Sequence, residues 1–329
     1  MHKKILFVAT IIILSMLLNS QVFAEETGKE PYEIVYVAKL IGIPWFNVTE
    51  DGIKEASKEY GVNGYLVGPP DPDPAQQARI VEDLVAKGVD AICVAPNDAD
   101  SLEPAFQKAK EKGILVLTHE SPNQKTLDYD IEMVNNQKFG EHHIDKLVEF
   151  MGDEGGYAVF VGGLTVPTHN AWADFAINYQ KEKYPKLNLV TDRIPCSESV
   201  ELSHDKTLEL IKAYPELKGI VAFGSLGPIG AAQAVREKGL EDKITVVGTA
   251  IPSHAAPYLQ DGSMKHGILY SPFATGKAVV YLAKYLLDGN NIADLKNIPD
   301  VGEIRLEGKI IVVDGMIDIT AENAESYGF

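Results

Sequence analysis

Polar and aromatic residues follow the ends of most strand-like segments of this 329-residue chain. They are Lys39, Trp45, Phe46, Asn97, Asp98, His119, Glu120, Thr168, His169, Asn170, Ser225, Thr249 and Ser271. Carboxylates, amides and a lysine can satisfy the hydroxyl groups of a neutral polyol, and an indole can cover the apolar side of a ring. Each polar residue taken alone also fits a helix N-cap or a turn. As a set that converges on one cleft, they predict a ligand-binding site.

Three of these residues carry more specific expectations. Lys39 and Glu120 follow strands that we expect to end at the same edge of one sheet. We predict that they face each other and remain ionised in a desolvated cleft, where both can form charge-assisted hydrogen bonds to hydroxyls. The alternative is a solvent-exposed pair that contributes little. Trp45 is expected to stack on the ligand, and Trp172, the other tryptophan, is expected to pack in the core.

The strongest catalytic signatures are absent from the sequence, which contains no GxSxG, Walker, HExxH or CxxC motif. His142 and His143 are adjacent and so point to different faces of a helix, which disfavours a shared metal. We therefore expect no catalytic residue, metal or cofactor. The alternative is an exported carbohydrate-processing enzyme, whose two carboxylates, about 5–10 Å apart, would be Asp98 and Glu120.

Short apolar, β-branched segments alternate with amphipathic helical segments along most of the chain. The strand-like segments are 33–40, 64–67, 91–95, 115–119, 157–161, 189–194, 219–223, 244–248 and 265–270. The helical segments include 46–60, 74–87, 102–112, 138–151, 171–184, 200–214 and 229–238, with glycines at 61, 88, 113 and 239 marking helix ends. This alternation predicts an α/β protein with parallel sheets that carry helices on both faces.

Two similar lobes are indicated by length and by an internal match. A chain of 329 residues suggests two domains or one large one. Residues 80–96 and 207–223 both read as an amphipathic helix, a turn and a short apolar strand. Two doubly wound lobes fit these observations, and the cleft between their strand ends is then the expected ligand site.

Composition and the N-terminus indicate which partners the protein can bind and where it is located. The chain is 45% hydrophobic with a net charge of −17, which disfavours nucleic acid and anionic lipid as partners. The same acidity and the missing N-terminal helix-turn-helix argue against a repressor on this fold. Lys3 and Lys4 precede an apolar run of about 14 residues that is too short to span a membrane. Val22-Phe23-Ala24 then supplies a cleavage site, so residues 1–24 are predicted to be an export signal, with no cysteine there for a lipid anchor.

The chain has two cysteines, Cys93 and Cys196, each inside or just after an apolar segment. An exported pair can form a disulfide. Buried thiols are the favoured interpretation, because the two-lobe division places the cysteines in different lobes.

The segments YVAKLIGIPWFNVTEDGIKEA, LVAKGVDAICVAPND and GILVLTHESP carry a resemblance, which continues through TVPTHNAWADFA and FGSLGPIGAAQAV to the C-terminus. Here the chain resembles the type I periplasmic sugar-binding proteins of ABC importers. It looks closest to the autoinducer-2 receptors of the Lsr type, with rhamnose-binding relatives as neighbours. The resemblance implies two lobes joined by three crossovers, a ligand in the cleft, no catalysis and delivery to membrane permease subunits.

The site expected from the autoinducer-2 receptors is only partly present. Its lysine is Lys39, whereas Glu120 stands where an aspartate is expected. Thr168-His169 replaces an Asp-Gln pair, Phe223-Gly224-Ser225 replaces a Pro-x-Ala segment, and Ser271 replaces an aspartate. The resemblance thereby adds Phe223 to the predicted site. Because a hydrogen-bonding site rejects ligands that lack its partners, a pentose, a deoxyhexose or a related polyol is as good a candidate as autoinducer-2.

The predicted organisation follows from these observations. We expect an N-terminal lobe of residues 32–135 plus 272–301 and a C-terminal lobe of residues 136–271 plus 302–329. The crossovers are then near Asn135-Asn136, Ser271-Pro272 and Gly302-Glu303. We therefore expect a periplasmic, monomeric binding protein that captures a sugar, polyol or autoinducer-2 and does not bind nucleic acid.

Overall fold

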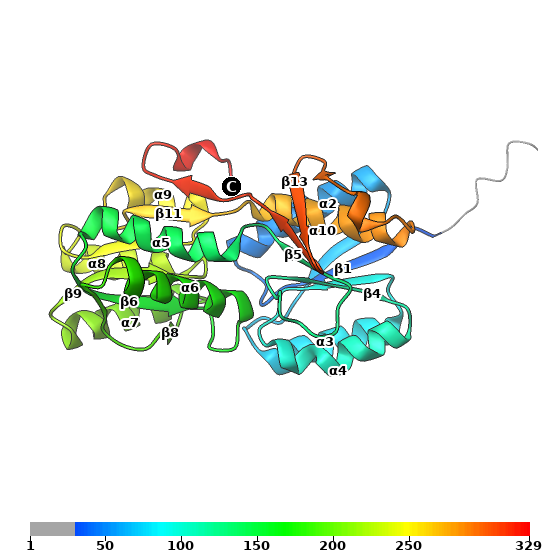
Figure 1. Ribbon diagram of the computed structural model, residues 1–329, viewed down its shortest axis with the longest axis horizontal. Helices are drawn as coiled ribbons and strands as arrows, with labels where there is room; N and C mark the ends of the chain where they lie inside the picture. Colours follow the sequence, from blue (N-terminus) through cyan, green and yellow to red (C-terminus); the bar gives the residue numbers. More distant parts are fainter. Residues whose placement is uncertain (1–29) are drawn as a thin grey trace, which may run out of the picture. The chain divides into compact units, whose positions relative to one another are not determined.

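The computed structural model describes residues 30–329, and Tyr32–Phe329 forms one compact unit (Figure 1). The predicted export signal, residues 1–24, lies outside the described residues. Two mostly parallel sheets, each covered by helices, confirm the predicted α/β architecture with two lobes. Within the described part of the chain, no helix combines the length and the hydrophobicity that a membrane crossing requires.

The sheet of the first lobe has eight strands, and the six from β14 to the edge strand β2 run parallel. In spatial order they are β12 (Asn297–Ile298), β13 (Gly302–Glu307), β14 (Ile310–Val313), β5 (Tyr129–Glu132), β4 (Leu115–His119), β3 (Ala91–Val94), β1 (Glu33–Val37) and β2 (Asn63–Val67). β13 pairs antiparallel with both β12 and β14.

Helices pack in pairs on the two faces of this sheet. α2 (Pro44–Tyr60) packs against α10 (Pro272–Leu287), and α3 (Pro74–Lys87) packs against α4 (Ala99–Glu111). Side chains alternate along β1, so Tyr36 joins the core that includes α2 and α10, whereas Val35 and Val37 join the core beneath α3 and α4. A short 3-10 helix, Ile292–Asp294, follows α10.

The sheet of the second lobe has the same construction. Its path is β15 (Ile317–Ile319), β11 (His266–Leu269), β10 (Thr245–Gly248), β9 (Leu217–Ala222), β6 (Gly155–Val161) and β7 (Leu187–Leu189), with β8 (Ile194–Pro195) pairing to β6. Only β15 runs antiparallel to its neighbour. The predicted strand 189–194 is thus two separate strands, since both pair with β6 at different positions.

Five helices complete the second lobe. α5 (Asn136–Met151) packs against α6 (Pro167–Lys183), and α7 (Val200–Ala213) packs against α8 (Gly227–Lys238). α9 (Pro252–Gln260) contacts α8, β11 and the 3-10 helix Ala324–Ser326. The internal match is confirmed, because α3–β3 and α7–β9 are both helix–turn–strand units in their respective lobes.

The chain crosses between the lobes three times, and one crossover differs from the prediction. The first two lie between β5 and α5 and between β11 and α10, near the predicted Asn135-Asn136 and Ser271-Pro272. The third was expected near Gly302-Glu303, but β13 and β14 complete the first sheet, since β14 pairs parallel with β5. The chain therefore crosses after Val313, and residues 302–313 belong to the N-terminal lobe rather than the C-terminal one.

Local sequence signals explain where the helices begin and end. α2, α3, α6, α9 and α10 all begin with proline, whose fixed φ suits the first helical position. α2 ends at Gly61 with φ 65°, and α3 ends at Gly88 with φ 80°, as predicted. The loops that leave β1, β2, β6, β10 and β11 each lead into one of these helices, which holds the loop residues at the strand ends. Cys93 and Cys196 are both buried and free, which confirms the prediction of two thiols.

Candidate functional site

A cavity lies where the carboxyl ends of strands from both lobes meet. Its lining residues are Lys39, Ile43, Trp45, Phe46, Glu120, His169, Trp172, Glu198, Gly224, Ser225 and Thr249. The first five follow β1 or β4 of the first lobe, and the others come from the second lobe. The enclosed space is about 20 Å³, which is room for about one water molecule. A sugar is much larger, so lining groups must move apart to admit one.

Lys39 is the centre of a buried ionic cluster. Its Nζ donates to Glu120 Oε2 at 2.8 Å, and it lies 3.0 Å from His169 Nε2 and 3.9 Å from Glu198 Oε1. Burial opposes the charged form of this lysine, but the carboxylates of Glu120 and Glu198 outweigh it and raise the Lys39 pKa. The contacts to His169 and Glu198 join the first lobe to the second.

Glu120 is held in an uncommon backbone conformation. Its φ is 61°, in the left-handed region that a non-glycine residue rarely adopts. Its Oε1 accepts a hydrogen bond from the Tyr270 hydroxyl, and its Oε2 accepts from Lys39. Burial alone would raise the pKa of Glu120, but the Lys39 ammonium holds that pKa well below its usual range. An ionised carboxylate kept in a strained conformation is a feature of functional sites.

His169 presents a hydrogen-bond donor to the cavity. Burial and the nearby Lys39 lower its pKa to about 3, so the imidazole is neutral at pH 7. The Gly162 N–H donates to His169 Nδ1 at 3.1 Å. Because a neutral imidazole has one acceptor nitrogen, the hydrogen resides on Nε2 and faces the Lys39 ammonium. Two donors thus lie 3.0 Å apart, and a ligand oxygen within hydrogen-bond distance of both nitrogens would accept from both.

Glu198 supplies an unused acceptor. Its Oε1 is buried and has no hydrogen-bond partner among the described residues. Burial raises the pKa of this carboxyl to about 6, although Lys39 opposes the shift. An unpartnered buried oxygen costs free energy unless a hydroxyl donates to it. A ligand hydroxyl is therefore a suitable partner for Glu198.

Aromatic rings form the apolar part of the wall. Trp45 meets Tyr270 edge to face, with centroids 5.1 Å apart. Trp172 stacks on the His169 ring with centroids 5.5 Å apart, and its Nε1 donates to Asn136 Oδ1 at 2.7 Å. One tryptophan from each lobe thus lines the cavity. Indole faces beside charged hydrogen-bonding groups suit a ligand with one apolar face and several hydroxyls.

This fold and this cavity agree with a family match. The model for the periplasmic binding protein domain matches residues 34–291. The chain belongs to the periplasmic binding protein family. It is a binding protein rather than an enzyme, in agreement with the prediction from the sequence.

Individual relatives of this periplasmic binding protein match most of its length at modest sequence identity. A ribose import binding protein of Bacillus subtilis is 23% identical over 80% of this chain and 85% of its own length. A D-ribose/D-allose-binding protein of Pseudomonas aeruginosa is 28% identical over 72% and 76% of the two chains. Among solved structures, LsrB from Clostridium saccharobutylicum in complex with AI-2 superposes with a TM-score of 0.83 at 23% identity, covering 90% of this chain and all of the other. A solute-binding protein from Clostridium phytofermentas with bound L-rhamnose gives 0.82 at 25%, covering 91% and 98%.

Seven of the fourteen residues that we predicted for the site line the cavity of this periplasmic binding protein. They are Lys39, Trp45, Phe46, Glu120, His169, Ser225 and Thr249. Lys39 and Glu120 face each other as predicted, both with side chains 6% exposed. The exposed-pair alternative is therefore excluded.

Three other predicted residues, none of them in the cavity lining, contact lining residues or residues packed beside them. Asn97 donates from Nδ2 to the Lys39 carbonyl at 2.7 Å. His119 Nδ1 lies 2.9 Å from the Tyr36 hydroxyl, and its ring meets Tyr270 edge to face. Phe223 packs against Trp172. Asn97 and Phe223 thus support lining residues directly, whereas His119 packs behind the cavity wall.

The remaining four predicted residues have local roles. Asp98 and Ser271 cap α4 and α10 by accepting from the N–H groups of Ser101 and Ala274. Asn170 donates to the Gly163 and Val166 carbonyls, and Thr168 is buried without a partner for its hydroxyl among the described residues. Because Asp98 caps a helix outside the cavity lining, the cavity does not contain the Asp98–Glu120 pair that the enzyme alternative requires.

Four lining residues, Ile43, Trp172, Glu198 and Gly224, were not predicted. Glu198 lies just after β8, a two-residue strand with no periodicity to mark its end. Trp172 packs on Phe139, as expected, but it also reaches the cavity through the first turns of α6. Gly224 has φ 123°, and a side chain there would collide with Ser197, 2.6 Å from the position of its Cβ.

Proposed function

We propose that this protein is the solute-binding component of an ABC importer for a small sugar or polyol. It captures the ligand between its two lobes and delivers it to membrane permease subunits. The observation that carries this proposal is the buried cluster of Lys39, Glu120, His169 and Glu198 beside two tryptophans, contributed by both lobes. Export by the predicted signal of residues 1–24 would place the protein in the periplasm.

The relatives support a carbohydrate as the ligand class. Their names specify ribose, allose, apiose and xylitol, and the solved neighbours include complexes with L-rhamnose, D-arabinose and AI-2. Such ligands share several hydroxyl groups and an apolar ring face. The cavity offers matching groups: a cationic donor at Lys39, an acceptor at Glu198 and aromatic walls. Autoinducer-2 is the second candidate, favoured by the fold similarity to LsrB.

Contacts across the lobes support capture by closure. Lys39 reaches His169, and the Thr165 hydroxyl donates to the Asn97 carbonyl at 2.9 Å. A ligand that touches groups of both lobes favours the state in which the lobes approach each other. Closure of this kind buries the ligand and gives the permease a distinct loaded form to recognise.

A thermal-shift screen tests the proposal. The panel is D-ribose, D-allose, D-arabinose, L-rhamnose, xylitol and AI-2, each present in large excess. A ligand at about 100 times its Kd adds about 2.7 kcal/mol to the stability of the folded state, so its melting temperature should rise clearly. A rise with AI-2 but not with any sugar would support the Lsr-type alternative. No rise with any member would overturn the proposed ligand class.

A further inference from the structure

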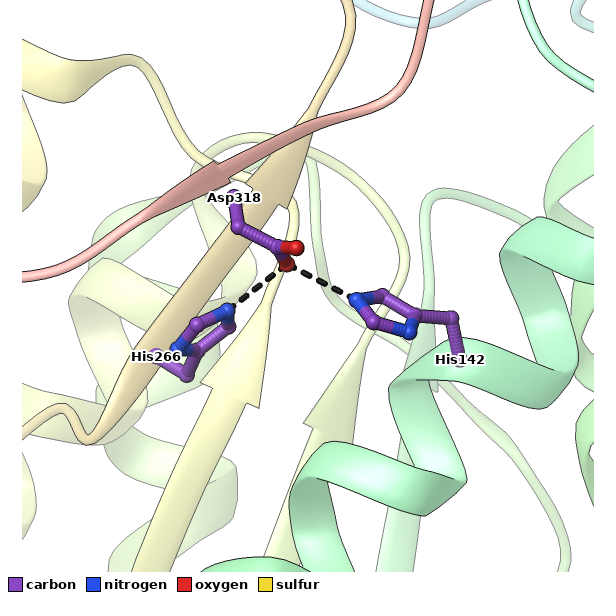
Figure 2. Close-up of side chains that lie close together, drawn as sticks. All are labelled: His142, His266 and Asp318. Atoms are coloured by element: carbon purple, nitrogen blue, oxygen red, sulfur yellow. Dashed lines mark hydrogen bonds and ion pairs between the residues drawn. The ribbon is translucent and has the colours of Figure 1, made fainter. Parts of the chain in front are cut away.

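Two histidines and an aspartate come together in the second lobe, away from the cavity. His142 comes from α5, His266 from β11 and Asp318 from β15 (Figure 2). Asp318 Oδ1 lies 2.8 Å from His142 Nε2 and 2.7 Å from His266 Nε2. One atom from each residue lies within 4.8 Å of the other two. None of the three residues lines the ligand cavity.

The three elements are those that connect the lobes. α5 begins immediately after the first crossover, β11 ends just before the second, and β15 begins just after the third. The register of β11 and β15 pairs Ile268 with Asp318, and Asn323 Nδ2 donates to the Asp318 carbonyl. The cluster therefore joins three elements that each adjoin a crossover, and pairing between β11 and β15 fixes the backbone of two of them.

We propose that His142, His266 and Asp318 bind a divalent transition-metal ion of the Zn²⁺ type. Two imidazole nitrogens and one carboxylate oxygen form a ligand set that such ions prefer. Ligand atoms about 2.1 Å from a tetrahedral Zn²⁺ ion are about 3.4 Å apart. The present separations of 2.7 and 2.8 Å between Asp318 Oδ1 and the two imidazole nitrogens are shorter than this by less than about 1 Å, so these ligand atoms would have to move apart by that small amount to hold the ion.

Exposure and charge favour such a site. The His266 side chain is only 5% exposed and forms a fixed anchor, whereas His142 and Asp318 are 24% and 42% exposed and open the site to solvent. An ion can enter from that side, and water can fill its remaining positions. The Asp318 carboxylate supplies a negative charge for the cation to neutralise, on a chain whose net charge is −17.

We predicted no metal from the sequence, so this site departs from that expectation, but the adjacent histidines do not share a metal, as expected. His143 does not take part, because its Nδ1 contacts the Phe139 carbonyl and its ring packs on Phe223. The partners of His142 instead lie 124 and 176 positions further along the chain, and only the fold brings them near. An ion held there would join three separate elements and so stabilise the second lobe.

The test is a calorimetric titration of the full, untagged and chelator-treated chain with ZnCl₂. Saturable 1:1 binding is expected, and His142→Gln and Asp318→Asn should each weaken it at least about tenfold. His204→Gln is the matched control, because His204 also lies between two carboxylates, Asp205 and Glu237, but with no second histidine. That variant should bind Zn²⁺ as the unaltered chain does.

A second measurement detects the bound ion directly by its absorption spectrum. Co²⁺ in place of Zn²⁺ should give a visible absorption band that is lost in His142→Gln and retained in His204→Gln. Because His266 is buried and its replacement can impair folding, His142 and Asp318, which are more exposed, decide the outcome. The proposal is overturned if Zn²⁺ does not bind saturably, if the double variant His142→Gln/Asp318→Asn binds as tightly as the unaltered chain, or if His204→Gln loses as much affinity.

Discussion

Lys39 Nζ lies 2.8 Å from Glu120 Oε2, although 81 positions separate the two residues and both are buried. Each follows a strand of the same sheet, with one strand, β3, between theirs. Burial raises the cost of leaving either charge alone, so the pair is stable only while both members are present. The two side chains therefore hold each other in place at the centre of the cavity.

Removing one member of this pair should destabilise the fold. We expect Lys39→Met or Glu120→Gln to lower the free energy of unfolding by about 3–5 kcal/mol, because the partner is left buried and unpaired. The double variant should lose less than the sum of the two single variants. Urea denaturation measures all three.

A matched exposed pair provides the control for that experiment. Lys125 Nζ and Asp100 Oδ1 are 2.9 Å apart, but their side chains are 75% and 83% exposed. Lys125→Met should change the free energy of unfolding by only about 0–1 kcal/mol. Equal losses in Lys39→Met and Lys125→Met would contradict the special role of the buried pair.

The two tryptophans should both report ligand binding. Trp45 and Trp172 are the only tryptophans in the chain, and both line the cavity. Trp172→Phe leaves Trp45 as the sole source of indole emission, and Trp45→Phe leaves Trp172. A ligand identified by the screen should change the emission of each variant. Emission from Trp45 that stays constant at saturating ligand would remove this residue from the site.

Acid should weaken the fold in part through His119. Burial lowers the pKa of His119 to about 4, whereas an unfolded chain has a histidine pKa of about 6.5. The unfolded state therefore binds more protons between these values, so the stability from this residue is present above pH 6.5 and is lost as the pH falls towards 4. The loss amounts to about 1.4 kcal/mol for each pH unit.

His119→Asn isolates this contribution, because every other titrating group is common to both proteins. The free energy of unfolding should fall less steeply with acid in the variant than in the unaltered chain between pH 6.5 and 4. Urea denaturation at several pH values gives both slopes. Parallel curves would show that His119 does not titrate differently in the folded state.

Gly162 controls the positions of two cavity side chains. A Cβ at this position would lie 2.6 Å from Glu198 Oε1 and 2.9 Å from His169 Nδ1. Gly162→Ala should displace both groups and weaken ligand binding by about tenfold or more, which corresponds to about 1.4 kcal/mol. Gly163→Ala is the control, because its Cβ would meet only Val166 Cγ2 at 3.4 Å. Equal affinity in the two variants would contradict this role of Gly162.

Much of the fold and half of the predicted site could be inferred from the sequence, because both depend on local patterns. The alternation of strand and helix is visible in hydrophobic periodicity, and residues such as Lys39 and Glu120 come directly after apolar strands. The third crossover could not be located in this way. A hairpin such as β13–β14 has the same pattern in either sheet, and only its pairing with β5 decides where it belongs.

Other features depend on contacts between distant residues. Glu198 reaches the cavity through a loop after the two-residue strand β8. The cluster at Asp318 requires β15 to pair with β11 after the third crossover. Asp98 and Ser271 show the converse, since a strand-end position alone does not distinguish a helix cap from a ligand contact.

Isothermal calorimetry with the sugar panel and a Glu198→Gln variant tests most directly whether the cavity is a carbohydrate site. The unaltered chain should bind one member of the panel at 1:1 stoichiometry. Glu198→Gln should bind it at least about tenfold more weakly, because one carboxylate oxygen becomes an N–H donor and the other loses the charge that strengthens its hydrogen bonds. Glu201→Gln, at an exposed position in the first turn of α7, should bind as the unaltered chain does. Undiminished affinity in Glu198→Gln, or no binding of any member of the panel, would contradict the proposed site.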